Sequence, residues 1–105
     1  MKHIITNLNK AFDHRTRLGI MSMLMVNEWM DFNGFKETLD DIKDGTLASH
    51  LKALEKEKYI EIRKRFVERK PNTSYRATEA GRQAFNDHLN ALEEILKAVE
   101  RTGDE

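Results

Sequence analysis

The 105-residue sequence contains no cysteine. A disulfide framework, a thiolate metal site and a cysteine nucleophile are therefore all excluded, and a reducing, cytoplasmic setting is the simplest expectation. No apolar run approaches the roughly 20 residues that span a bilayer, so we expect no membrane segment. The first six residues lack the long apolar stretch and the small-residue cleavage site of a signal peptide.

Repeats, linkers and low-complexity segments are also absent from the sequence, and its length fits one domain over residues 1–105. Hydrophobic residues make up 39% of the chain and charged residues 34%. This composition predicts a modest core under a heavily charged surface.

The net charge of the chain is zero, which at first argues against binding to nucleic acid. The charge is unevenly distributed, however, with a net +3 on residues 1–27, −4 on 28–42, +5 on 43–76 and −4 on 77–105. A local basic surface matters more for phosphate binding than the charge of the whole chain. We therefore expect any contact with nucleic acid to involve residues 43–76.

A short amphipathic helix is predicted within this basic segment. Leu47, Leu51 and Leu54 recur at spacings of four and three residues, so they lie on one face of a helix. Asp44 is expected to be its N-cap. The opposite face carries the polar residues Ser49, His50, Lys52 and Lys56.

A β-hairpin is predicted directly after this helix. Residues 59–63 alternate apolar and polar side chains, which is typical of a strand. We expect this strand to cover residues 59–67, and residues 74–77 to return as a second strand. Between them, residues 68–73 read as a polar turn that contains Pro71, the only proline of the chain. The sequence thus predicts a hairpin with a long, basic tip.

Four further elements are expected from the apolar periodicity. A short helical piece spans residues 8–12, and helices cover residues 14–26 and 33–39. A final helix runs from Glu79 to about Glu100, with Thr78 as its N-cap.

The order of these elements predicts the fold class. A helix-turn-helix followed by a hairpin is a winged helix. We therefore predict an α+β, mostly helical fold, a winged helix-turn-helix with a two- to three-stranded wing over residues 59–77 and a long C-terminal helix.

Three segments carry a resemblance to a known family. They are HRTRLGI at 14–20, DGTLASHLKALE at 44–55 and YRATEAGR at 75–82. Together they resemble the single-domain winged-helix transcriptional regulators of bacteria and archaea, which are related in pattern to the MarR and ArsR groups. The likeness covers about residues 8–97, and its motifs are fairly specific when they occur together in this order.

The resemblance implies sequence-specific binding of double-stranded DNA by a homodimer that regulates transcription. The helix over residues 45–57 would lie in the major groove as the recognition helix, and the wing would contact phosphates or the minor groove. The terminal helices would build the dimer. ArsR-like metal sensors usually bind metal through cysteines, which this chain lacks, so no metal or other cofactor is expected. A small-molecule effector has no support in a chain of this length.

Thirteen residues are candidates for DNA contact. Short hydroxyl and imidazole side chains can meet base edges, and cationic side chains on a wing can follow phosphates or reach a minor groove. Because side chains alternate along a strand, Arg63 and Arg65 cannot share a face with Lys64. The candidates are Lys43, Gly45, Thr46, Ala48, Ser49, His50 and Lys52 on the helix, and Arg63, Lys64, Arg65, Arg69, Lys70 and Arg76 on the wing.

Plainer interpretations of these residues stay open. The polar helix face can be an ordinary solvated surface, and His50 can pack against a neighbouring element as a structural residue. The cations of the wing can serve to prevent aggregation through a sheet edge.

The last helix carries a heptad-like apolar seam, for which we prefer dimerisation over packing against its own domain. At 1.5 Å per residue the helix is roughly 30 Å long and would overhang a domain of this size. The predicted interface residues are Phe85, Leu89, Leu92, Leu96 and Val99.

No enzymatic activity is expected, because the sequence has no glycine-rich phosphate loop, no nucleophile–base motif and no metal triad. The four histidines, His3, His14, His50 and His88, lack metal-ligand spacing. The methionine-rich stretch from Met21 to Met30 is expected in the core rather than at an adaptable ligand surface. The main competing function is a winged-helix module that binds other proteins and has no role on DNA.

Overall fold

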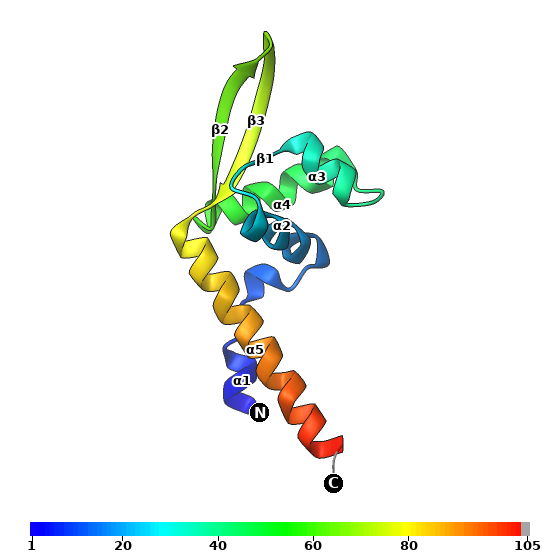
Figure 1. Cartoon of the computed structure of the whole chain (residues 1–105), viewed down its shortest axis with the longest axis vertical. Coiled ribbons are helices and arrows are strands. Elements are labelled where there is room, and N and C mark those ends of the chain that lie inside the picture. Colours follow the sequence, from blue (N-terminus) through cyan, green and yellow to red (C-terminus); the bar gives the residue numbers. More distant parts are fainter. Residues whose placement is uncertain (104–105) are drawn as a thin grey trace.

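The computed structural model describes residues 1–103. In chain order they form α1 (Lys2–Thr6), the 3-10 helix η1 (Lys10–Phe12), α2 (Arg15–Val26), β1 (Met30–Asp31), α3 (Phe32–Thr38), α4 (Asp44–Lys56), β2 (Ile60–Val67), β3 (Lys70–Ala77) and α5 (Glu79–Gly103). Helices α2, α3 and α4 cluster beside the root of the β2–β3 hairpin, and α5 runs away from them with α1 at its side (Figure 1). The predicted α+β winged-helix architecture is confirmed.

The three strands form one antiparallel sheet in the order β1-β3-β2. The short β1 pairs Met30 with Tyr75, and the long β2 pairs with β3 from Ile60 opposite Ala77 to Val67 opposite Lys70. The central strand is therefore held on both sides only near its end at Ala77. The other half of the hairpin projects as a two-stranded ribbon (Figure 1).

The predicted long tip of the hairpin is wrong. The strand β3 already begins at Lys70, so the turn consists only of Glu68 and Arg69, with φ angles of 52° and 67°. Positive φ at both central residues is the signature of a type I′ turn, whose twist matches the strands on either side. The usual sequence for this turn is Asn-Gly, so Glu-Arg did not indicate it. Pro71 lies in a strand whose other edge is open at this point, which a sheet tolerates.

The core lies between the helices and one face of the sheet. Leu47, Leu51 and Leu54 of α4 are buried there, as their spacing predicted. The methionine-rich stretch packs in or against the same core, as expected. The other core residues are Phe12, Ile20, Met21, Leu24, Phe35, Ile60, Tyr75, Ala77 and Phe85.

The two predicted N-caps have different outcomes. The prediction that Asp44 is the N-cap is wrong, because α4 starts one residue earlier than expected and Lys43 occupies the N-cap position. The Asp44 carboxylate instead lies in the first turn, where the helix dipole favours it, 2.7 Å from Lys36 Nζ. The prediction that Thr78 is the N-cap of α5 is confirmed, since its Oγ1 accepts a hydrogen bond from the Gly81 N–H at 3.0 Å.

The start of α5 explains the glycine of the Y-R-x-T-x-x-G-R pattern. A Cβ at position 81 would lie 2.0 Å from the backbone oxygen of Tyr59. That oxygen also accepts a hydrogen bond from the Thr78 N–H at 3.0 Å. Only glycine therefore lets α5 pass this close to the start of β2.

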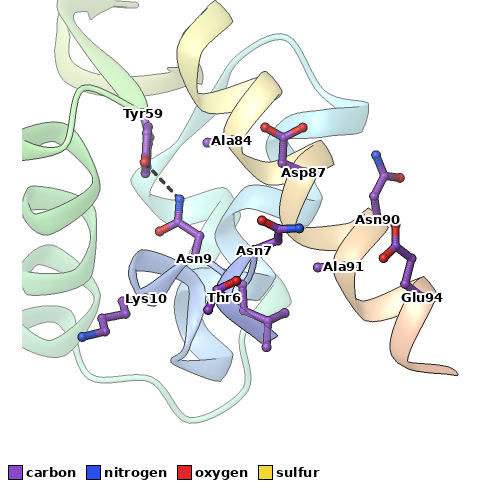
Figure 2. A pocket seen from close by; sticks show the side chains of 11 residues that line it. Thr6, Asn7, Asn9, Lys10, Tyr59, Ala84, Asp87, Asn90, Ala91 and Glu94 are labelled. Carbon is purple, nitrogen blue, oxygen red and sulfur yellow. Dashed lines mark hydrogen bonds between the residues drawn. The ribbon is translucent and has the colours of Figure 1, made fainter. Parts of the chain in front are cut away.

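The first half of α5 is anchored to the body of the protein. His88 is 5% exposed, and its Nδ1 accepts a hydrogen bond from the backbone N–H of Asn9 at 3.0 Å. The side-chain amide of Asn9 in turn donates a hydrogen bond to the Tyr59 hydroxyl at 3.0 Å (Figure 2). Burial lowers the pKa of His88, against the opposing effect of Asp13, so the neutral acceptor form is favoured.

The second half of α5 extends beyond the body. A helix of 25 residues is about 37 Å long, and the whole molecule measures 62 × 27 × 21 Å. Its radius of gyration is 16.1 Å, whereas a compact chain of this length has about 13 Å. The only element beside this half of α5 in Figure 1 is α1, which was not predicted and which buries Ile4.

Candidate nucleic-acid interface

Helix α4 turns one face inward and presents the other on the surface. Its three leucines are buried in the core, so the residues between them must point outward. The structure leaves six of the predicted contact residues exposed on and just before this helix, Lys43, Gly45, Thr46, Ala48, Ser49 and Lys52. Most of these side chains are short, which lets a surface approach the helix backbone closely.

The seventh candidate on this helix, His50, is held by its own chain. Arg17 Nε donates a hydrogen bond to His50 Nδ1 at 3.0 Å, and the His50 ring lies 4.2 Å from the ring of His14. Burial, His14 and Arg17 all lower the pKa of His50. The neutral imidazole thus ties α4 to the start of α2, which favours the structural interpretation of this residue.

The cations of the hairpin divide between its two faces. In the register of the ladder, Arg63 and Arg65 share one face with Arg76, while Lys64 pairs with Thr73 on the other. Lys64 is on the side of Ile60 and Tyr75, which is the side where the helices pack. The predicted separation of Arg63 and Arg65 from Lys64 is therefore present in the structure.

Two of these arginines form a layer on Trp29 at the root of the hairpin. The guanidinium carbon of Arg63 lies 3.9 Å from the Trp29 ring centroid, and that of Arg76 lies 4.8 Å from it. Arg76 Nε also donates to the Glu61 carboxylate. Within residues 1–103, the buried Nε of Arg63 has no hydrogen-bond partner. Arg63 and Arg76 thus brace the hairpin, whereas Lys64, Arg65, Arg69 and Lys70 are exposed.

The role of Trp29 could not be read from the sequence. It precedes β1, and the pairing of β1 with β3 brings it beside arginines from both hairpin strands. An arginine over an indole ring is a favourable cation–π pair. From the sequence, residues 29–32 could be a small strand or an extended link, and neither interpretation indicates this contact.

A hollow of about 720 Å³ lies between residues 6–10 and α5, with Tyr59 at its wall (Figure 2). Its walls are mostly polar, and they include Asn9, whose amide is already bonded to Tyr59. No group of three His, Cys, Asp or Glu side chains within the described chain could hold a metal ion. No helix of residues 1–103 has the length and hydropathy that a membrane span requires.

Comparison with known proteins identifies the family. The model of the winged helix DNA-binding domain matches residues 16–96, from the start of α2 to the second half of α5. The chain belongs to this winged-helix DNA-binding family. The expected resemblance to winged-helix transcriptional regulators is thereby confirmed.

Similar proteins agree with this assignment. An uncharacterized protein of Methanocaldococcus jannaschii is 32% identical over 91 residues, which are 87% of this chain and 98% of that protein. The structure of a transcriptional regulator homologue from Pyrococcus horikoshii OT3 has a TM-score of 0.81 at 26% identity, covering 93% of this chain and 94% of that one. A candidate MarR-family regulator from Enterococcus faecalis V583 shares the fold at 20% identity, with a TM-score of 0.68 over 98% of this chain and 87% of that one.

The Trp29 layer leads to a stability prediction. We expect Arg63→Ala to lower the free energy of unfolding by about 1 kcal/mol, because it removes a partly desolvated cation–π contact. Trp29 is the only tryptophan, so its fluorescence emission should also shift as the ring becomes more exposed. Urea unfolding followed by this emission measures both effects.

The matched control is Arg65→Ala, an exposed arginine two residues further along the same face. It should change stability by less than about 0.5 kcal/mol and leave the emission in place. Equal effects of the two substitutions would show that Arg63 does not brace the hairpin.

Proposed function

We propose that this winged-helix protein is a homodimeric transcriptional regulator that binds double-stranded DNA sequence-specifically. In this proposal α4 enters the major groove, and the hairpin contacts phosphates or the minor groove. The observation that carries it is the exposed polar face of α4 beside a projecting cationic hairpin. The family assignment supports DNA as the partner.

The dimensions and chemistry of α4 suit a major groove. Its 13 residues span about 20 Å, and the groove of B-DNA, about 12 Å wide, admits one α-helix. Thr46 and Ser49 carry hydroxyl groups that can donate to and accept from base edges. Ala48 is small enough to touch a thymine methyl group, and Lys43 and Lys52 can reach phosphates at either side.

The hairpin supplies the electrostatic part of the interaction. Four exposed cations lie on its outer half, Lys64, Arg65, Arg69 and Lys70, against one acidic residue, Glu68. Each cation that neutralises a phosphate releases condensed counterions and so adds affinity that falls with salt. The whole-chain charge of zero does not oppose this, because the acidic residues are concentrated in other segments.

A second copy of the chain is the proposed partner of α5. Leu89 and Leu92 are each 40% exposed, Leu96 is 56% exposed and Val99 is 60% exposed, on a helix that overhangs its own domain. Their spacing of three and four residues makes one stripe that a second α5 can cover. Phe85 drops out of the predicted interface, because it is 1% exposed inside its own core and packs against Phe12.

The recognition-helix assignment is tested by selecting binding sites from random duplex DNA. We expect Thr46→Ala and Ser49→Ala to relax the selected motif at one or two positions, since a lost base contact removes about 1–3 kcal/mol of discrimination. Ser22→Ala changes an exposed serine of α2 and should keep the wild-type motif. Wild-type motifs from both α4 variants would refute the assignment.

The dimer is tested by analytical ultracentrifugation of Leu92→Glu/Leu96→Glu. Burial of each leucine contributes about 1.5–3 kcal/mol, so the double change should weaken association by more than about a hundredfold. Val26→Glu replaces an apolar residue of α2 that is 81% exposed and should leave the assembly unchanged. A wild-type protein that sediments as a monomer would contradict the proposed dimer.

A further inference from the structure

Phe66 is the one aromatic residue of the described chain whose ring is mostly exposed to solvent. It is 75% exposed, whereas the other seven aromatic side chains are buried or half-buried. It is not among the residues that form the core or pack against it, and the end of the hairpin projects from the body of the protein (Figure 1). An exposed apolar ring on a projecting ribbon indicates a contact with another molecule.

The turn and the cross-strand partner restrict the backbone conformation at Phe66. The ring is attached two residues before the type I′ turn, and its cross-strand partner is Pro71, whose φ is fixed by its own ring. In a two-residue hairpin the pair next to the turn is hydrogen-bonded and the following pair is not, so the Phe66 and Pro71 side chains stand close together. The two residues form one small apolar surface near the end of the hairpin.

This surface is on the same side of the sheet as the helices. Phe66 lies on the same face of the strand as Lys64, Ile62 and the buried Ile60, which is part of the core. The leucine face of α4 packs in that core as well. A duplex that is bound to the outer face of α4 and reached by the hairpin would therefore meet this side of the ribbon.

The charges around the ring select the kind of partner. Lys64 lies on the same face as the ring, Arg69 lies in the turn, and Arg65 and Lys70 lie on the opposite face. With Glu68 as the single acid, these residues give the end of the hairpin a net charge of +3. Such a surface attracts a polyanion and is repelled by a second copy of itself. An apolar ring on a cationic ribbon fits the minor groove of DNA, where phosphates flank a channel of stacked bases.

We propose that Phe66, with Pro71 beside it, is a wedge that the hairpin inserts into the minor groove and partly between two base pairs. Apolar side chains used in this way unstack a base step and bend the duplex towards the major groove. Flexible pyrimidine–purine steps such as TA are the easiest to open, so the wedge adds a preference for such steps beside the α4 site. This inference rests on the proposed DNA-binding function and adds a contact to it.

The test measures affinity and bending together on a duplex with repeated TA steps that carries a fluorophore at each end. Phe66→Ser should lower affinity about tenfold and reduce the energy-transfer change that reports bending. The slope of affinity against salt should stay the same, because no charge is removed. Phe66→Leu keeps an apolar wedge and should retain most of the bend.

Val67→Ser is the matched control, since Val67 is 42% exposed on the other face of the same ribbon and should affect neither readout. If Phe66→Ser binds and bends the duplex as the wild type does, the wedge is refuted and the DNA-binding function stands. If wild-type protein binds no duplex at low salt, the DNA-binding function and the wedge both fall. If Phe66→Ser abolishes self-association and leaves DNA binding unchanged, Phe66 belongs to a protein interface and the wedge is again refuted.

Discussion

Burial of one face of α4 is the constraint on which the rest of the structure depends. Leu47, Leu51 and Leu54 each contribute about 1.5–3 kcal/mol by leaving water, and together they fix the rotation of the helix. Once that rotation is fixed, Thr46 and Ser49 can only point outward. The core beneath the helix thus determines the candidate interface, and the polar residues on its outer face do not have to stabilise the fold.

The hairpin is under a different constraint, because its outer half does not pack against the core. Arg63 and Arg76 pack on Trp29 at its root, and a two-residue type I′ turn closes its far end. Between the root and the turn, a ribbon of eight-residue strands projects from the body of the protein. Burial of the exposed cations in a core would be costly, whereas on the projecting hairpin they keep their hydration and stay accessible to a polyanion.

The sequence predicted the elements whose apolar residues repeat strictly, because one periodicity then determines both the local structure and the buried face. The leucines of α4 are the clearest case, and the order of elements around them was enough to predict the winged helix. Contacts between residues that are far apart in the sequence could not be predicted from it. Nothing near Arg63 indicates Trp29, and the burial of Phe85 depends on Phe12, which lies at the other end of the chain. The Glu68–Arg69 turn was missed because its conformation is imposed by the strands.

The most direct test of the account is a fluorescence-anisotropy titration of mixed duplex DNA at increasing salt, with wild-type protein and Arg69→Gln/Lys70→Gln. We expect tight wild-type binding at low salt that weakens steeply as salt is added. The double variant should have a salt slope smaller by about 1.8, since each lost phosphate contact removes about 0.9. No binding at low salt would contradict a DNA-binding role and make a protein-interaction module the leading alternative. Equal slopes for the two proteins would contradict the role of the hairpin on phosphates.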